Sequence, residues 1–166
     1  MKHAWCLALA LTACAGAPDE RSDWERKHAQ KIAIAPDEPV TLPAYPRKDR
    51  LISFFVAPTS EFRFYVDAAS VSVANDVVRY ALVARSSAGV ENVTYEGMRC
   101  GTGEVRIYAI GRDGEWVGKP GEWRPIQPRS YERWHNALYR EYFCPSTQAI
   151  GSREDAVAAL RSGGVR

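Results

Sequence analysis

The sequence predicts an α+β fold, in which a curved antiparallel β-meander of about six to seven strands carries one or two C-terminal helices packed on one face. Two observations predict it. Between residues 51 and 117, short runs rich in Val, Ile, Phe and Tyr alternate apolar with polar positions and are separated by short turns, which favours sequential antiparallel strands. After residue 130, apolar residues recur at helical spacing instead.

Seven strands are expected, at residues 51–56, 62–66, 71–73, 77–85, 90–100, 104–110 and 115–117. In the strongest of them, 77–85, the even-numbered residues from Val78 to Ala84 form one face and the odd-numbered residues from Arg79 to Arg85 the other. Turns are predicted at 75–76, 86–89, 101–103 and 111–114, where Asn, Asp, Ser and Gly tolerate turn backbone.

Two helices follow, each with a serine at its expected N-cap. Ser130 is expected to cap a helix over 131–143, and Ser152 a helix over 153–161 that ends at Gly163-Gly164. The apolar stripe of the first helix consists of Tyr131, Trp134, Ala137, Leu138 and Tyr142. The second helix turns Val157 and Leu160 inward.

Residues 1–13 are interpreted as a lipoprotein signal peptide. The apolar run at 4–13 spans only about 15 Å as a helix, half of a ~30 Å hydrocarbon core, so it is too short to cross a membrane. Leu11-Thr12-Ala13-Cys14 resembles a lipobox, the motif at which bacteria acylate the cysteine and remove what precedes it. We therefore expect lipidation of Cys14. The alternative is ordinary cleavage at a small residue such as Ala15 or Ala17, which would give a soluble periplasmic protein.

The residues after this cysteine are expected to form a tether and then one domain. Ala15, rather than Asp, follows Cys14, which by resemblance to enteric sorting rules favours an outer-membrane lipoprotein facing the periplasm. Residues 14–46 read as the lipidated cysteine and a proline-rich tether, in which Ser22 and Glu25 have the capping-box spacing for a short helix. Residues 47–166 read as a single domain.

The charge balance argues against a polyanionic partner. The chain has 22 basic and 20 acidic side chains, and loss of Lys2 with the leader leaves 21 basic ones. A nearly neutral domain gives no support for nucleic-acid binding. The hydrophobic fraction of 46% is ample for a core.

The cysteine count predicts one disulfide. Cys6 leaves with the leader and Cys14 takes lipid, so Cys100 and Cys144 remain as an even pair in an oxidising compartment. Their bond would join the end of a strand to the end of the first helix. With both thiols bonded, we expect no metal site. The dinucleotide, P-loop, esterase and zinc-protease motifs are also missing, so we expect no cofactor.

His135 is the candidate for acid/base chemistry. Glu132 lies three residues before it on the predicted helix, where a carboxylate can orient a general base. The alternative is a histidine on the helix surface that packs against the aromatic edges of Tyr131 and Tyr139.

Two further features are candidates for binding. The loop that contains Trp116, Lys119 and Trp123 could recognise a glycan or a peptide, or its tryptophans could close the end of the sheet. Arginines also recur along the predicted strands, at Arg63, Arg79, Arg99 and Arg106, with Asp67, Glu96 and Glu104 nearby. Such a row either binds an anion or forms cross-strand ion pairs.

Several motifs together resemble the CNP1-like family, exported proteins of proteobacteria. The most specific are Arg63-Phe64-Tyr65-Val66-Asp67 and Tyr95-Glu96-Gly97-x-Arg99-Cys100, supported by Leu42-Pro43-Ala44-Tyr45-Pro46 and Tyr142-Phe143-Cys144-Pro145. The resemblance covers about residues 24–145. It implies one domain, supports the paired cysteines and brings no catalytic residues with it.

The sequence thus favours an envelope lipoprotein without catalysis, a tethered module that binds a partner or stabilises an assembly. Its expected partners are the membrane, through the acylated cysteine, and an envelope protein or glycan. Two alternatives stay open: a small envelope hydrolase that uses His135 with nearby carboxylates, and a carrier of a small ligand.

Overall fold

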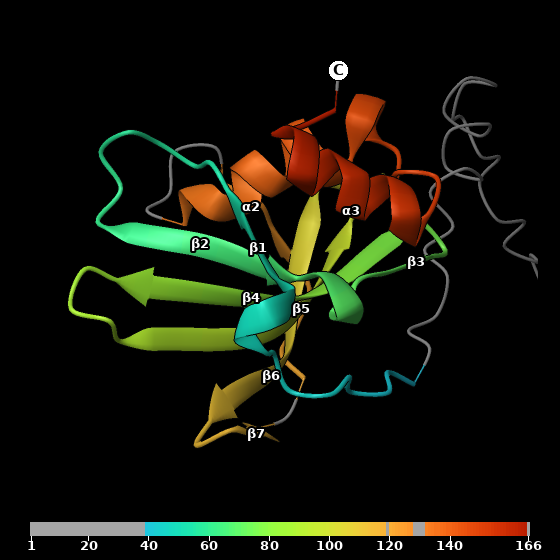
Figure 1. Ribbon diagram of the computed structural model, residues 1–166. Coiled ribbons are helices and arrows are strands. Elements are labelled where there is room, and N and C mark those ends of the chain that lie inside the picture. The colour runs from blue at the N-terminus through green and yellow to red at the C-terminus, as the bar shows by residue number, and fades with distance from the viewer. Residues whose placement is uncertain (1–38, 119, 128–131, 166) are drawn as a thin grey trace, which may run out of the picture. The chain divides into compact units, whose positions relative to one another are not determined.

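The computed structural model describes residues 39–118, 120–127 and 132–165 (Figure 1). Residues 1–38 lie outside these ranges, including Cys14, Ser22 and Glu25, and so do Lys119, Ser130 and Tyr131. Predictions about the leader, the lipid anchor and the tether helix therefore stay predictions, as does the boundary between tether and domain.

The described residues form an α+β fold around one antiparallel sheet of eight strands, which confirms the predicted class. The strands are β1 (Leu51–Phe54), β2 (Phe62–Asp67), β3 (Ser72–Ala74), β4 (Val77–Ser86), β5 (Glu91–Arg99), β6 (Glu104–Arg112), β7 (Glu115–Val117) and β8 (Arg124–Pro125). The main path runs β1-β2-β4-β5-β6-β7, while β3 pairs with β4 and β8 pairs with β6.

Two hairpin turns follow from residues that tolerate positive φ. Asn75 and Asp76 have φ of 51° and 60° and join β3 to β4, while Asp113 and Gly114, at 53° and 84°, join β6 to β7. Positive φ at both central residues is the type I′ geometry, whose twist matches that of the flanking strands. These turns lie where the sequence predicted them.

The sheet departs from a strict meander beside β4. Both β2 and β3 pair with the same edge of β4, β2 with its C-terminal half and β3 with its N-terminal end. Between them the chain leaves the ladder in a short 3₁₀ turn, η2 (Ala68–Ser70). The hydroxyl of Ser70 fills the gap, because it accepts a hydrogen bond from the Ala81 N–H at 2.7 Å and donates one to the Asp67 carbonyl.

The first strand is shorter than expected. It ends at Phe54 rather than at residue 56, because the Phe55 N–H donates to the Tyr142 hydroxyl at 3.2 Å instead of extending the ladder. A 3₁₀ turn, η1 (Lys48–Arg50), leads into it.

The C-terminal helices lie on the same side of the sheet (Figure 1). The first comprises α2 (Arg133–Ala137) and a π-helical continuation, η3 (Leu138–Phe143), followed by a 3₁₀ turn, η4 (Pro145–Thr147). It begins at Arg133 rather than at residue 131. Glu132, whose backbone is not helical, is held by an ion pair to Arg124 of β8.

The second helix, α3 (Arg153–Ser162), matches the sequence prediction. The Ser152 hydroxyl caps it by accepting from the Asp155 N–H, and Gly163 ends it in the left-handed conformation. Val157 and Leu160 are buried as expected. No helix among the described residues is long and apolar enough to cross a membrane.

Each face of the sheet carries a cluster of buried apolar residues. The larger cluster lies under the helices and takes the even-numbered residues of β4, as the alternation predicted; its most deeply buried members include Val78, Tyr80, Met98, Leu138 and Phe143. The opposite face, which we call the helix-free face, carries a second cluster: Ala81, Tyr95, Tyr108 and Ala109 are buried there, and Val40, Trp116 and Trp123 pack against them.

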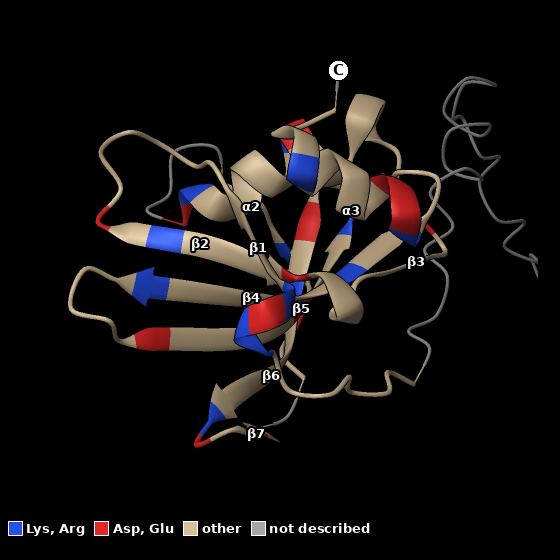
Figure 2. Ribbon diagram, in the orientation of Figure 1, with Lys and Arg blue, Asp and Glu red and all other residues tan. Residues whose placement is uncertain are grey.

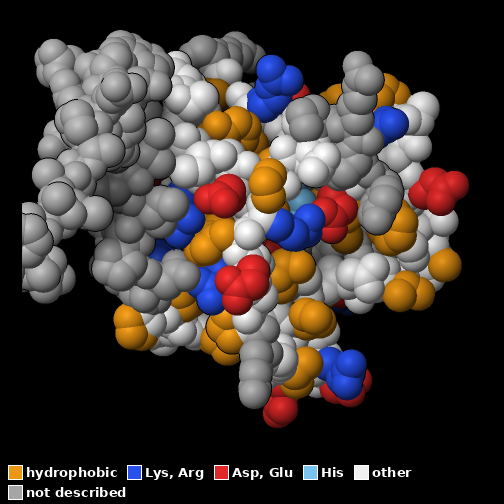
Figure 3. Space-filling view, turned by 180° about the vertical axis from the view of Figure 1, so that it is seen from behind, with side chains coloured by type: hydrophobic (Ala, Val, Ile, Leu, Met, Phe, Trp, Pro, Cys, Tyr) orange, Lys and Arg blue, Asp and Glu red, His pale blue; other side chains and the backbone are white. Residues whose placement is uncertain are grey.

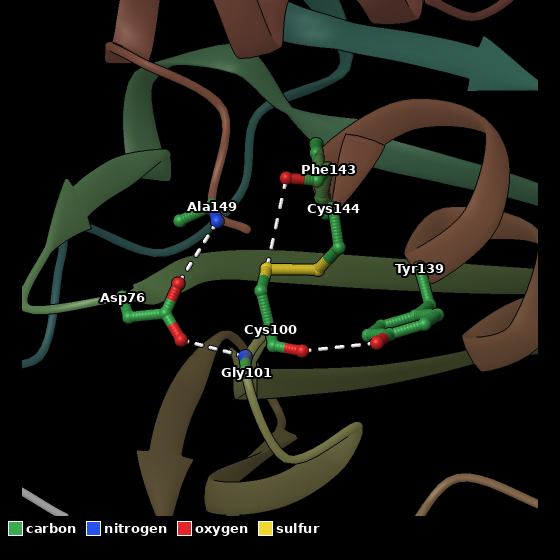
Figure 4. The surroundings of a disulfide bond; sticks show 7 residues. All are labelled: Asp76, Cys100, Gly101, Tyr139, Phe143, Cys144 and Ala149. Carbon is green, nitrogen blue, oxygen red and sulfur yellow. Dashed lines mark hydrogen bonds between the residues drawn. A yellow bond between two sulfur atoms is a disulfide. The ribbon is translucent and has the colours of Figure 1, made fainter. Parts of the chain in front are cut away.

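The predicted disulfide between Cys100 and Cys144 is present and closes a loop of 44 residues (Figure 4). It joins the end of β5 to the end of η3. Asp76 reinforces the junction, because its carboxylate accepts from the Gly101 N–H at 2.6 Å and from the Ala149 N–H at 2.9 Å. The Tyr139 hydroxyl donates to the Cys100 carbonyl. A disulfide and several hydrogen bonds therefore join the sheet to the helices where β5 and η3 end.

Candidate functional site

The first helix points His135 into the molecule rather than to its surface. The side chain is only 2% exposed, so the expectation of a surface histidine is wrong. Trp134, a member of the apolar stripe, packs against the larger cluster, and the next residue, His135, reaches Glu96 on the sheet. Glu132 directly precedes the helix instead of lying on it as predicted, and its carboxylate is 3.7 Å from the imidazole Nδ1.

The closer partner of His135 is Glu96 in the middle of β5. The two side chains are nearly completely buried, and Glu96 Oε2 lies 2.9 Å from His135 Nε2. The Tyr80 hydroxyl donates to the same oxygen at 2.9 Å, and the Thr94 hydroxyl donates to Oε1 at 2.7 Å. The carboxylate is therefore bound from β4, from β5 and from the helix.

These contacts keep Glu96 ionised in the interior. Burial by itself raises the pKa of the carboxyl, but the charge of protonated His135 and hydrogen bonds from His135, Thr94 and Tyr80 outweigh it and hold the pKa below its usual value. Burial, followed by the charge of Glu96, raises the pKa of Tyr80 well above its usual value. Its hydroxyl thus stays protonated and remains a donor.

The contact of Trp134 with His135 competes with the ion pair. The indole N–H points at Nε2 of the neighbouring ring at 3.1 Å. Nε2 accepts this hydrogen bond only when it carries no proton, whereas it donates to Glu96 only when it does. The tautomer of the ring therefore decides whether Nε2 donates to Glu96 or accepts from the indole.

A small cavity, the His135 pocket, opens beside this pair. Its volume is about 240 Å³. The apolar wall consists of Phe62, Phe64, Leu82, Ala84, Ile107 and Trp134. Polar groups come from Asn92, Thr94, Glu96, Glu132 and His135. An apolar cavity with a few convergent polar groups has the composition of a small-molecule site.

Both ring nitrogens of His135 face carboxylates. Nε2 contacts Glu96, and Nδ1 faces Glu132, which is itself held by two hydrogen bonds from Arg124. A general base must direct a nitrogen to the proton that it removes. The histidine is therefore better placed to hold the two carboxylates in the pocket wall than to take a proton from a substrate.

The tryptophans of the candidate recognition loop are packed on the helix-free face. Trp116 donates its N–H to the Pro43 carbonyl at 2.8 Å and lies 5.1 Å from the ring of Tyr45. The ring of Trp123 is covered by the guanidinium of Arg99, whose Cζ lies 4.0 Å from its centroid. Both side chains are only partly exposed. Trp116 thus holds Pro43 and Tyr45 against the sheet, whereas Trp123 packs against Tyr108.

The predicted row of arginines separates into different environments. Arg99 pairs with Glu104 at 3.1 Å, whereas Asp67 pairs with Arg50, and Glu96 lies on the other face of the sheet. Basic and acidic residues are interspersed along the ribbon and on the rear surface (Figures 2 and 3). Arg99–Glu104 is thus a cross-strand ion pair of the expected kind, whereas Asp67 and Glu96 pair with Arg50 and His135, which are not in the row.

Sequence reasoning did not single out Glu96 as the partner of His135. A signal was present in the strand: Glu96 has the same parity as Met98 and Cys100, so it lies on their face of β5. A glutamate on the same face of a strand as core residues needs a hydrogen-bond donor inside the protein, and His135 of the helix supplies it. Among the described residues, no group of three or more His, Cys, Asp or Glu side chains is placed to hold a metal ion.

Comparison with known proteins gives one match. Residues 35–161, more than half of the chain, match the family model described as the CNP1-like family. No curated protein and no solved structure matches the chain.

Proposed function

The chain belongs to the CNP1-like family, and from the site described above we propose that it is a membrane-tethered binding protein of the bacterial envelope. It holds a compact ligand in the His135 pocket and performs no catalysis. The observation that carries this proposal is the cavity of about 240 Å³, which has apolar walls and the buried Glu96–His135 pair at its side.

The dimensions and charges of the pocket restrict the ligand. Sites for drug-sized ligands measure about 300–1,000 Å³, so this cavity suits a smaller molecule. Among the described residues, the lining of the pocket includes two carboxylates, Glu96 and Glu132, and no Lys or Arg. A compact apolar compound with a hydrogen-bond donor or an amine therefore fits better than an anion.

Titration calorimetry with three compact aromatic probes tests the pocket. We expect benzylamine and indole to bind more tightly than benzoate. Ala84→Leu, which fills the cavity, should weaken benzylamine binding by about tenfold or more, because a compact ligand competes with the added atoms for space. Ala88→Leu makes the same change in an exposed turn and serves as the control. Equal affinities in wild type and Ala84→Leu would exclude the pocket as the binding site.

The tether is tested independently. Mass spectrometry of the protein from membranes should find a mature chain that begins with acylated Cys14, and Cys14→Ala should release the protein from the membrane fraction. An unmodified N-terminus at Gly16 or Pro18 would contradict the tether and leave the pocket proposal in place.

A hydrolase is the second candidate, because His135 lies beside a carboxylate in a pocket. Both of its ring nitrogens face carboxylates, which is why we rank it below binding. Ester hydrolysis that exceeds the buffer rate and is abolished by His135→Ala, with wild-type folding retained, would reverse this ranking. The same rate in both proteins would support the binding function.

A further inference from the structure

Two arginines lie on either side of a glycine on the helix-free face. In the sheet register, Arg79 of β4 is opposite Gly97 of β5, and Gly97 is opposite Arg106 of β6. The three positions form one row across three neighbouring strands. Because the middle position has no side chain, the two guanidinium groups border a space above the backbone of β5.

Tyr108 occupies this space and directs its hydroxyl into it. A Cβ at position 97 would lie 2.7 Å from the Tyr108 hydroxyl, so the phenol lies directly over the glycine. The β5–β6 register shifts next to this point, which leaves Tyr108 as the extra residue of a β-bulge. The guanidinium carbons of Arg79 and Arg106 lie 6.0 and 5.4 Å from the centre of its ring.

Within the part of the chain that the structure describes, one polar atom of Tyr108 and one of Arg79 lack hydrogen-bond partners. The Tyr108 side chain is 4% exposed, and its hydroxyl has no hydrogen-bond partner among the described residues. Arg79 Nε is buried and also has none. Buried polar groups are nearly always satisfied, so two donors left without acceptors side by side indicate an acceptor that binds from outside.

The local charge has the sign that such an acceptor requires. Arg99 on the same face is neutralised by Glu104, but no ion pair of Arg79 occurs within the described ranges. Arg106 donates to the neutral carbonyl of Gly121 at 2.7 Å. Both Arg79 and Arg106 are partly exposed, so solvent reaches the row.

We propose that Arg79 and Tyr108 form a binding site for an oxyanion, a carboxylate or phosphate group, on the helix-free face. The planar guanidinium donates to two oxygens of such a group, and the Tyr108 hydroxyl donates to a third lone pair. The site lies on the face opposite the His135 pocket and does not depend on it.

Inorganic phosphate is the probe. Titration into protein at constant ionic strength, followed by the side-chain NMR signal of Arg79 Nε–H, should show saturable binding. Arg79→Gln should weaken binding by about tenfold or more, because it removes a charged hydrogen bond. Tyr108→Phe should weaken it by several-fold while the fold is retained, since the ring still packs over Gly97.

The matched control is Arg85→Gln. Arg85 lies on the same face of β4 but is paired with Glu91, so its loss should leave phosphate binding unchanged. The same affinity in wild type, Arg79→Gln and Tyr108→Phe would overturn the proposal and indicate an adventitious ion only. Circular dichroism and thermal unfolding verify that each variant is folded.

Vesicles then identify the source of the oxyanion. Binding to phosphatidylglycerol vesicles that is lost in Arg79→Gln, competed by phosphate and absent with phosphatidylcholine vesicles assigns the site to a lipid phosphate. Phosphate binding without vesicle binding assigns it to a soluble anion. Vesicle binding that is unaffected by Arg79→Gln, in a protein that does not bind phosphate, contradicts the site.

Discussion

Glu96 and His135 show how a residue pair far apart in the sequence determines the chemistry of a buried site. They are 39 residues apart, and each would be costly in the interior without the other. The Tyr80 and Thr94 hydroxyls complete the hydrogen bonding of the carboxylate. The result is an ionised group held in a fixed orientation beside the pocket.

This pair predicts a pH dependence of stability. Because the folded state lowers the pKa of Glu96 below its unfolded value of about 4.3, the ionised carboxylate stabilises the fold fully above that value. The stabilisation is lost as the pH falls through the lower folded pKa. Glu96→Gln should reduce the free energy of unfolding at pH 7 by about 2 kcal/mol and flatten its decline between about pH 5 and pH 3.

Urea denaturation at a series of pH values measures both effects. The control is Glu91→Gln, since Glu91 pairs with Arg85 near the surface and such pairs contribute only about 0–1 kcal/mol. A decline with acid as steep in Glu96→Gln as in wild type would assign the pH dependence to other groups.

At the scale of elements, the edge of β4 shows how two short strands replace one long one. β2 and β3 share this edge, and η2 interrupts them opposite Ala81. An unpaired N–H in the middle of a buried sheet is costly, so the interruption requires a substitute acceptor. Ser70 provides it, and this explains why a serine is 5% exposed between two strands.

Ser70→Ala should therefore destabilise the protein through the sheet. The loss of the acceptor leaves the Ala81 N–H unsatisfied, at a cost of about 1–3 kcal/mol. Hydrogen exchange of that amide should accelerate by more than that of its neighbours on β4. Ser87→Ala, at an exposed turn position, is the control. Unchanged exchange at Ala81 would mean that the hydroxyl does not substitute for the ladder.

At the scale of the whole molecule, several contacts join the sheet to the helices. The larger core packs α2, η3 and α3 on β4 and β5, and the disulfide with the Asp76 hydrogen bonds fastens one corner (Figure 4). The Glu96–His135 pair is a second such contact, and its histidine lies nine residues before Cys144, which follows the end of the helix. Together they fix both ends of the helix that lines the pocket.

Removal of the disulfide should loosen the helix against the sheet. A closed loop of 44 residues stabilises by about 4 kcal/mol in the chain-entropy model, and the double variant Cys100→Ala/Cys144→Ala should lose about that much. Chemical denaturation of the variant, and of wild type with and without reductant, measures it. If the protein is equally stable in all three cases, the bond contributes nothing to the fold.

The sequence by itself determined the features that depend on local pattern or on counting. Alternation along 77–85 identified both faces of β4, because side chains on a strand alternate strictly. Turn residues located the hairpins, since Asn, Asp and Gly accept positive φ. The number of cysteines identified the disulfide, and Ser152 marked the start of α3.

Only the tertiary structure decided which side chains meet. Strand parity shows that Glu96 shares a face with Met98, but it does not tell which face the helices cover or which helix residue reaches it. The helical spacing predicted that His135 lies near Glu132. It did not tell whether the His135 side chain points toward the sheet or toward solvent. The row of Arg79, Gly97 and Arg106 likewise exists only through the strand register. Such contacts depend on how the strands pair and on which face of the sheet the helices pack, and residues near in sequence do not specify either.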